Sequence, residues 1–241
     1  NLMAEQLEKK QSNIMLWNAG IAHELRTPVT FLKGRLQGVL DGVFEPNEAL
    51  IHTLLKQTEN LTHLIEDLRL LSLIENDHLK LSIQEVETKT LIEEKLHEFS
   101  AALAEANLKP ILDIQSAAIH CDPFRLQQII AALLDNMVRY SNAGNLYITT
   151  KMIDHQWIFT IEDEGPGIPE SEQARIFESF YRANHPSKYS KQGTGLGLSI
   201  VKKLVEAHQG TFSYQLTENG GSCFKIGMIH KNYIYRLNYY E

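Results

Sequence analysis

The first indication of the fold comes from residues 21–42, which read IAHELRTPVTFLKGRLQGVLDG. Together with the residues that precede it from Leu7 onward, this stretch places apolar side chains three and four positions apart, the pattern of a long amphipathic helix. The Asp41-Gly42 pair ends the helix, because glycine favours the backbone conformation that follows a helix C-terminus. The sequence therefore predicts one long helix that ends near residue 40.

A second amphipathic helix is predicted after a short connection, residues 42–46. Asn47 is a favoured N-cap residue, and leucine and isoleucine recur at helical spacing from Leu50 to Ile74. Two long helices joined by so few residues form an antiparallel hairpin. A lone hairpin leaves much of its leucine stripe in water, so we predict that two chains pair into a four-helix bundle. The alternative is a monomer that folds the hairpin onto the rest of its own chain.

Composition limits the classes of protein to which the chain can belong. Its 241 residues carry 23 basic and 30 acidic side chains, a formal net charge of −7, with 43% hydrophobic and 22% charged residues. This balance is typical of a soluble globular protein of about two domains. The acidic excess argues against direct binding of nucleic acid, which draws on positive charge. The chain has only two cysteines, Cys121 and Cys223, which fits a reducing compartment.

From about residue 80 the pattern changes to short strands that alternate with helices, as in a mixed α/β layer. We expect the hairpin to occupy residues 1–78, the α/β domain residues 79–229 and a tyrosine-rich tail residues 230–241. The polar stretch 169–192, with a short helical piece that carries phenylalanine, is predicted to cover a site as a loop. The predicted strands are 81–86, 111–115, 146–153, 157–162, 211–216 and 222–229, and the predicted helices are 90–107, 123–140 and 196–208.

A polar triplet, His23, Glu24 and Thr27, lies inside the first helix beside Pro28. His23 and Thr27 are four residues apart and so share one helix face. Pro28 cannot donate a hydrogen bond to the carbonyl of Glu24, so we expect the helix to bend or loosen there. Imidazole is a nucleophile able to attack phosphorus, and Glu24 is placed to take a proton. The alternative is an ordinary histidine on the exposed side of an amphipathic helix.

The predicted helix 123–140 carries a second set of polar residues. Asn136, Arg139 and Tyr140 stand at positions i, i+3 and i+4 and so lie on neighbouring faces. An amide oxygen is a ligand for Mg²⁺, a guanidinium suits phosphate, and a tyrosine ring packs on a purine. The alternative is a helix that is merely amphipathic.

Two glycine-containing segments follow. Asp163 stands at the end of a predicted strand before Gly165 and Gly167, where its carboxylate can accept a hydrogen bond from an exocyclic amine such as that of adenine. A glycine turn with a surface aspartate is the alternative. Residues 193–198, GTGLGL, lead into a helix and allow backbone N–H groups to approach phosphate. Their spacing matches neither the P-loop nor the dinucleotide-binding pattern.

In this order, the segments resemble the sensor histidine kinases of two-component signalling, over about residues 10 to 229. His23-Glu24-x-x-Thr27-Pro28 resembles the H box of this family, Asp163-x-Gly165-x-Gly167 its G1 box, and residues 193–198 its G2 box. The N box is matched by Asn136, Arg139 and Tyr140, and the F box by Phe177 and Phe180.

The resemblance implies a fold and a reaction. The fold is α+β: an antiparallel helical hairpin forms a dimeric four-helix bundle, followed by an α/β sandwich ATP-binding domain of the gyrase/Hsp90/histidine-kinase/MutL type. His23 would attack the γ-phosphate of Mg·ATP, with Glu24 as the neighbouring acid–base residue. The phosphoryl group would pass to an aspartate of a response regulator that controls transcription. Thr27 would position the water that removes phosphate from this regulator.

The resemblance also implies the roles of the nucleotide-binding residues. Asn136 would be the Mg²⁺ ligand, Arg139 a phosphate contact, Tyr140 a ring against adenine, and Asp163 the acceptor for the adenine amine. Arg182 and Lys188 lie in the segment expected to cover the site. The other expected binding residues are Gly165, Gly167, Phe177, Phe180, Gly193, Thr194, Gly195, Leu196, Gly197 and Leu198.

The sequence departs from the family pattern at Ala132, where N boxes often carry a second asparagine, and at Gln192, where G2 boxes often carry a glycine. The surroundings of the H box and the G1 box are similar to those of bacterial sensor kinases that control multidrug-efflux genes. Two rival interpretations are a nucleotide-gated ATPase without histidine chemistry and a dimerisation scaffold with an inactive nucleotide site.

Two further expectations concern the ends of elements and of the chain. Asp122 is predicted to cap the helix that begins at Pro123, rather than to bind a metal with His120 and Cys121. The chain begins without an initiator methionine and has no run of about 18 apolar residues. We expect it to be the cytoplasmic portion of a bacterial inner-membrane protein whose missing N-terminal part crosses the membrane.

Overall fold

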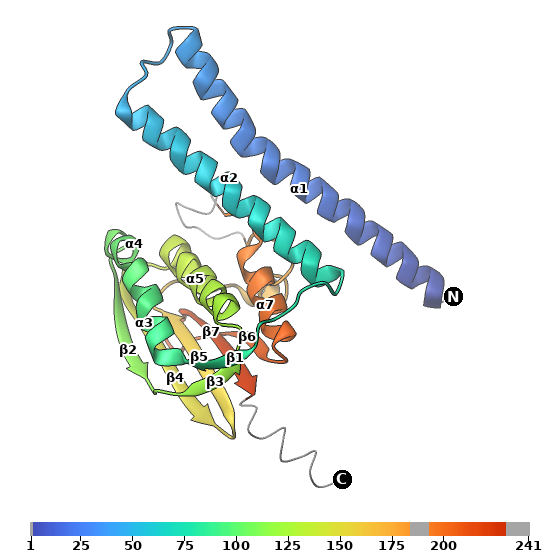
Figure 1. Cartoon of the computed structure of the whole chain (residues 1–241), viewed down its shortest axis with the longest axis vertical. Coiled ribbons are helices and arrows are strands. Elements are labelled where there is room, and N and C mark those ends of the chain that lie inside the picture. Colours follow the sequence, from blue (N-terminus) through green and yellow to red (C-terminus); the bar gives the residue numbers. More distant parts are fainter. Residues whose placement is uncertain (1, 184–192, 230–241) are drawn as a thin grey trace. The chain divides into compact units, whose positions relative to one another are not determined.

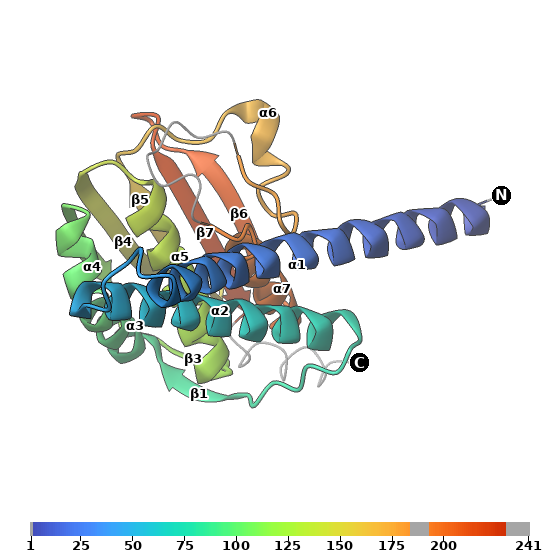
Figure 2. The ribbon, with the colours of Figure 1, turned by 90° about the horizontal axis from the view of Figure 1, so that it is seen from above.

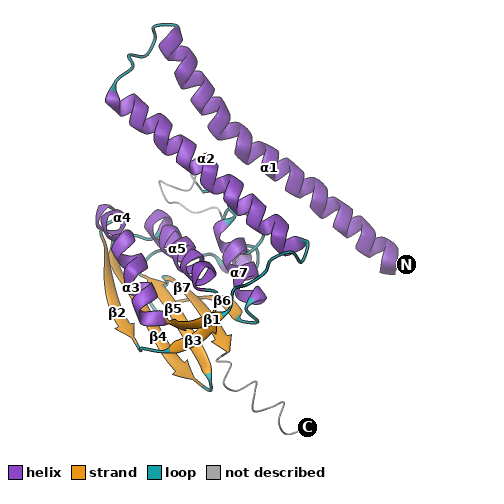
Figure 3. Ribbon diagram, viewed as in Figure 1, coloured by secondary structure: helices purple, strands orange, loops and turns teal. Residues whose placement is uncertain are grey.

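The computed structural model describes residues 2–183 and 193–229, with side chains of the first helix from residue 19 onward. Two compact units make up the chain, residues 1–76 and residues 77–241. The first unit contains helices, and the second combines strands with helices (Figure 3). Lys188, Gln192 and the tail 230–241 lie outside the described residues.

The first unit is the predicted helical hairpin, formed by α1 (Leu2–Leu40) and α2 (Glu48–Glu75) (Figure 1). Gly42 follows α1 with φ +71°, which glycine adopts without strain, and its N–H donates to the carbonyl of Val39 at 3.1 Å. Asn47 caps α2, its side-chain oxygen accepting from the N–H of Leu50 at 2.9 Å. Helix α1 continues through Pro28, so the proline does not end the helix.

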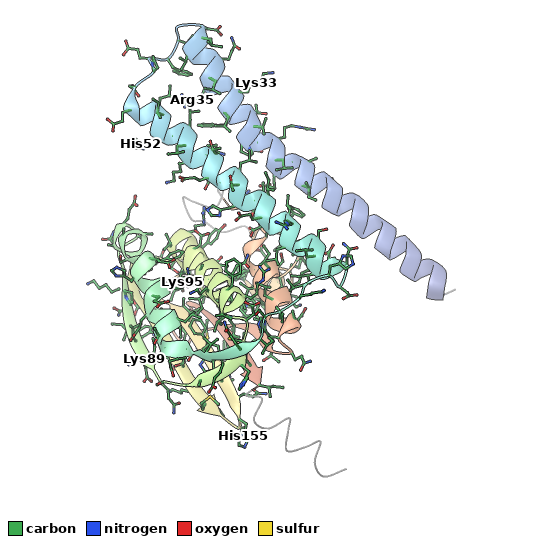
Figure 4. All side chains as sticks on the ribbon, viewed as in Figure 1. Lys33, Arg35, His52, Lys89, Lys95 and His155 are labelled. Atoms are coloured by element: carbon green, nitrogen blue, oxygen red, sulfur yellow. The ribbon has the colours of Figure 1, made fainter. Side chains whose placement is uncertain are left out.

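An aromatic contact organises the turn between the two helices. The guanidinium of Arg35 lies 4.7 Å from the centre of the Phe44 ring and 5.3 Å from that of Phe31, a favourable cation–π geometry. Arg35 lies near the connected ends of α1 and α2 in Figure 4. The Phe44 ring fills the space beside Gly38, where an added Cβ would lie 2.4 Å from a ring carbon. Glycine at position 38 therefore permits the packing of the turn.

A pair of glycine variants tests this packing. We expect Gly38→Ala to destabilise the hairpin by about 1–3 kcal/mol, because the Phe44 ring must move. Gly34→Ala is the matched control: it lies in the same helix, and an added Cβ there meets nothing within 4 Å. It should stabilise the protein by about 0.5–1 kcal/mol through helix propensity. Thermal unfolding of both variants measures the difference, and equal shifts would contradict the role of Gly38.

Large apolar side chains of the hairpin remain exposed in the single chain. In the described part of the hairpin, the residues whose exposed fraction is 50% or more are Val29, Leu36, Leu40, Val43, Ile51, Leu55 and Ile65. Exposed apolar patches of this kind are typical of surfaces that associate with another protein.

The second unit contains a five-stranded mixed sheet in the order β2-β4-β5-β7-β6. Strand β2 is parallel to β4, and the other neighbouring pairs are antiparallel. A separate two-stranded sheet pairs β1 with β3. The strands are β1 (Gln84–Glu87), β2 (Leu108–Ile114), β3 (Ala118–Cys121), β4 (Gly144–Ile153), β5 (Gln156–Asp163), β6 (Thr211–Leu216) and β7 (Ser222–Ile229).

Helices cover one face of the five-stranded sheet, as Figures 1 and 2 show from two directions. Burial alternates along β5, where Trp157, Phe159 and Ile161 are buried and face this helical layer. Leu133 and Leu134 of α5 are also fully buried. The helices of the second unit are α3 (Thr88–Glu98), α4 (Ser100–Glu105), α5 (Pro123–Tyr140), the short α6 (Glu170–Gln173) and α7 (Gly197–Ala207).

Several predicted boundaries were wrong. The helix predicted over 90–107 is two helices, because the chain breaks at Phe99 and the hydroxyl of Ser100 donates to the carbonyl of His97 at 2.7 Å. The strand predicted at 111–115 begins at Leu108, where parallel pairing with Gly144 sets its start. The strand predicted at 81–86 is shifted to 84–87 by pairing with β3. The expected phenylalanine-bearing helical piece ends at Gln173, so Phe177 lies in a turn.

The predicted capping role of Asp122 is confirmed. Its Oδ1 accepts from the N–H of Arg125 at 3.1 Å, with Pro123 in the first turn of α5, and its Oδ2 accepts from the N–H of Ser82 at 2.9 Å. Across residues 2–183 and 193–229, no three His, Cys, Asp or Glu side chains gather as a metal site. No helix within these ranges is both long and apolar enough to span a bilayer.

Candidate functional site

His23 lies on the exposed side of α1 with 77% of its side chain accessible, and Glu24 beside it is 21% accessible. The Nδ1 atom of His23 is 3.3 Å from Oε1 of Glu24. Neighbouring helical residues point about 100° apart, so the two side chains meet by bending toward each other. A carboxylate only accepts, so this contact favours the proton on Nδ1 and leaves the lone pair on Nε2 for nucleophilic attack.

Thr27 lies one helical turn beyond His23. Its hydroxyl donates to the carbonyl of His23 at 3.1 Å, and its side chain is exposed. Pro28 has no N–H to donate to the carbonyl of Glu24, so the helix lacks one backbone hydrogen bond beside the histidine. The three residues of the predicted polar triplet thus lie within about one turn of α1, with His23 and Thr27 exposed and Glu24 partly buried.

The last turns of α5 carry Asn136, Arg139 and Tyr140, all half-buried. Arg139 donates from Nε to Oδ2 of Asp135 at 2.6 Å. Burial opposes the charge of Arg139, but the hydrogen bond and the charge of Asp135 outweigh it, so the guanidinium pKa is raised. Burial raises the pKa of the Tyr140 phenol, against the opposing charges of Arg182 and Arg139. The i, i+4 spacing was the signal that predicts the Asp135 contact, and our sequence interpretation missed it.

Asp163 closes β5 with 5% of its surface exposed, and its carboxylate is held by three donors. Oδ1 accepts from the backbone N–H groups of Gly165 and Ser222, each at 2.8 Å. Oδ2 accepts from the hydroxyl of Ser141 at 2.6 Å. A carboxylate has about four acceptor positions. The described residues fill both positions on Oδ1 and one on Oδ2, which leaves the second position on Oδ2 for a ligand amine. Ser141 and Ser222 were missed from the sequence; the hydroxyl directly after Tyr140 was the available signal.

Two glycines of the site have conformations or neighbours that exclude other residues. Gly167 has φ +63°, and an added Cβ would lie 2.4 Å from the carbonyl oxygen of Gly220. Gly195 has φ +71°, and its Cβ would lie within 2.9 Å of backbone atoms of Phe180. The N–H of Phe180, which itself has φ +65°, donates to the carbonyl of Gly195 at 2.9 Å. This bond joins the predicted F and G2 segments.

Two of the predicted binding residues pack within the domain. The ring of Phe177 lies edge-on to Phe212 of β6 at 5.2 Å, with the Lys202 ammonium 5.4 Å from its centre. Leu196 is fully buried. Their side chains therefore hold the loops that carry Phe180 and Gly195.

Contacts bring the four segments of the second unit together into one site. Ser141 bonds to Asp163, and the hydroxyl of Tyr140 lies 2.4 Å from where a Cβ on Gly193 would stand. The remaining predicted residues extend the same loop: Thr194 accepts from the N–H of Leu196 at 3.3 Å, Gly197 borders open space, and Leu198 is half-buried. His23 and its neighbours belong to the first unit.

Both units match known families. Residues 15–77 match the His Kinase A (phospho-acceptor) domain, and residues 121–231 match the histidine kinase-, DNA gyrase B-, and HSP90-like ATPase. The chain is 33% identical over 212 residues to the signal transduction histidine-protein kinase BaeS of Escherichia coli, covering 87% of this chain and 45% of BaeS.

Solved structures are similar as well. The Acinetobacter baumannii histidine kinase AdeS shares 43% identity and a TM-score of 0.76, over 87% of this chain and 98% of that chain. Full-length ShkA in complex with AMPPNP shares 25% identity and a TM-score of 0.64, over 88% of this chain and 45% of that one.

A phospho-acceptor hairpin joined to an ATPase-type α/β domain defines the catalytic region of a histidine kinase. The chain belongs to the sensor histidine kinase family, and the predicted fold class is confirmed. It spans about half the length of BaeS.

Proposed function

We propose that the chain phosphorylates His23 from Mg·ATP and passes the phosphoryl group to an aspartate of a response regulator. The observation that carries the proposal is the exposed imidazole of His23 with the Glu24 carboxylate 3.3 Å from its Nδ1. In this arrangement the Nδ1 atom of His23 lies beside a base, and the Nε2 atom can attack an incoming phosphate. The chemistry of residues 1–78 is then phosphoryl acceptance, and that of residues 79–229 is nucleotide binding.

The proposed step is an in-line displacement. Nε2 of His23 forms the N–P bond to the γ-phosphorus as the P–O bond to the β-phosphate breaks and ADP leaves. Attack makes the ring cationic, and Glu24 accepts the hydrogen bond or the proton from Nδ1. Because histidine and nucleotide site belong to different units, the acceleration depends on bringing them into line.

The nucleotide site is proposed from the gathered segments of the second unit. Asp163 has an acceptor position for the amine of adenine. Arg139 and Thr194 contribute donors toward phosphate, and the Tyr140 ring packs on the base. The similarity to ShkA, solved with AMPPNP, supports binding of an adenine nucleotide.

Mg²⁺ fits this donor set, because the ion usually binds one or two protein oxygens together with substrate phosphates. The Asn136 amide oxygen, three residues before Arg139 on α5, would hold it. The ion supplies positive charge that neutralises the phosphates during transfer.

The same proposal includes a second subunit, a reaction with the response regulator and a location in the cell. The exposed apolar residues of the hairpin support a homodimer, since pairing removes them from water. The exposed Thr27 beside His23 supports removal of phosphate from the response regulator at the same surface. We propose attachment to a bacterial inner membrane through a part that precedes this sequence; control of efflux genes stays a prediction.

Incubation with γ-labelled ATP and Mg²⁺ tests the proposed function. We expect label on the protein that is lost in acid and kept in base, because a phosphoramidate bond is acid-labile. An ATPase without histidine chemistry would release phosphate and leave the protein unlabelled, and either an absent or an acid-stable label would contradict the proposal.

A further inference from the structure

Glu164, the residue after Asp163, is bound by three donors from β4. Its Oε1 accepts from the hydroxyl of Tyr147 at 3.0 Å and from Nδ2 of Asn145 at 3.1 Å. Its Oε2 accepts from the backbone N–H of Asn145 at 3.1 Å. Burial contributes little, because Glu164 is exposed. The three bonds, led by the backbone N–H of Asn145, hold the pKa of this carboxyl below its usual value.

Asp163 and Glu164 accept hydrogen bonds from the same stretch of chain, residues 141–147, on opposite faces of the sheet. Leu146 pairs with Asp163 in the ladder, so the next residue, Glu164, lies opposite Asn145 on the other face. On the helical side, Asp163 is bonded to Ser141. On the open side, Glu164 is bonded to Asn145 and Tyr147. Hydrogen bonds to both acids therefore connect residues 141–147 to the start of the turn that follows Asp163.

The close approach of Glu164 depends on the residue at position 144. An added Cβ on Gly144 would lie 2.6 Å from Oε2 of Glu164. Glycine at the start of β4 therefore leaves room for the carboxylate to reach the backbone N–H of Asn145. Glu164 thus accepts hydrogen bonds from three convergent donors, and Gly144 leaves room for its carboxylate. These groups lie on the face of the sheet opposite the Asp163 carboxylate.

We propose that Glu164 is a positioning residue for base recognition, which fixes the turn after Asp163 so that the available acceptor position of Asp163 meets the exocyclic amine of adenine. The inference rests on the proposed role of Asp163. The turn carries Gly165, whose N–H holds Oδ1 of Asp163 at 2.8 Å. Loss of the Glu164 contacts frees this turn and with it the orientation of the Asp163 carboxylate.

The test compares two nucleotides that differ only in the amine: ATP and purine riboside 5′-triphosphate, which lacks it. Isothermal titration of the full chain gives both dissociation constants. A hydrogen bond to a charged group corresponds to about a 10- to 100-fold preference of the wild type for ATP. We expect Glu164→Ala to weaken ATP about 5- to 10-fold and to leave the other nucleotide within about twofold, so that the preference falls.

Conservative and control variants separate positioning from folding. Tyr147→Phe removes one donor and should lower the preference about two- to threefold, and Glu164→Gln, which keeps an acceptor oxygen, should restore part of it. Glu94→Ala, an exposed glutamate of α3, should change neither constant.

Three results would overturn the inference. Equal weakening of both nucleotides in Glu164→Ala shows a structural role alone, and unchanged constants show no role. A wild type that binds both nucleotides equally removes the proposed recognition by Asp163 itself, which distinguishes that failure from a failure of Glu164.

Discussion

Replacement of His23 by glutamine is expected to abolish labelling of the protein by γ-labelled ATP, a loss limited only by the detection of the assay. Glutamine keeps a polar side chain of moderate size but offers no ring nitrogen to form the N–P bond. The imidazole is 77% exposed and makes its side-chain contact with Glu24, so its replacement should leave the fold intact. The affinity for ATP should stay within about twofold, because the proposed nucleotide-binding residues belong to the other unit.

His63→Gln is a matched control for this variant. His63 lies on α2 of the same hairpin, is also 77% exposed, and also faces a glutamate, with Nδ1 3.9 Å from Oε2 of Glu66. It should be labelled at the rate of the wild type. Persistent acid-labile label in His23→Gln, or equal loss of label in both variants, would contradict the assignment of His23.

The second large effect is expected for Asp163→Asn. The amide nitrogen is a donor. Placed at Oδ1 it would face the N–H groups of Gly165 and Ser222, and placed at Oδ2 it would make the hydroxyl of Ser141 turn and accept, leaving no acceptor there for the amine. We expect the affinity for ATP to fall about 100-fold or more, since the charged acceptor for the amine is lost as well. The free energy of unfolding should fall by about 1 kcal/mol, because hydrogen bonds to a charged carboxylate become weaker bonds to a neutral amide.

Titration calorimetry and thermal unfolding measure these two effects separately. Asp113→Asn serves as the control, because Asp113 lies on the edge strand β2 with 74% of its side chain exposed. It should match the wild type in both measurements. If Asp163→Asn binds ATP as tightly as the wild type, recognition of the adenine amine by Asp163 is wrong.

The elements that a single pattern specifies were predictable. The hairpin follows from apolar spacing. Local chemistry predicted where α1 ends, before Gly42, and where α2 begins, after Asn47. The cap formed by Asp122 was equally local. The break at Phe99 was not, since residues on both sides of it favour a helix and the break depends on a competing hydroxyl at Ser100.

The residues of the candidate site also divide into those that the sequence indicated and those that it did not. The order of its motifs indicated Asp163, Asn136 and Gly195, because each residue type has a distinct chemistry at its position. The partners that orient them were missed: Ser141, 22 residues from Asp163 in sequence, and Ser222, 59 residues away, meet it only after the sheet has formed. A hydrogen bond between distant residues leaves no periodicity in a sequence.

By itself, then, the amino-acid sequence determined a helical hairpin and an α/β layer and indicated the chemical groups of the proposed phosphoryl-transfer site, since helix spacing, caps and glycine turns act between near neighbours. Only the tertiary structure decided how β2 pairs in parallel with β4, how consecutive acids reach opposite faces of the sheet, and which three donors orient the Asp163 carboxylate. The reason is physical: strand register and buried polar contacts are fixed by the packing of segments that lie far apart along the chain.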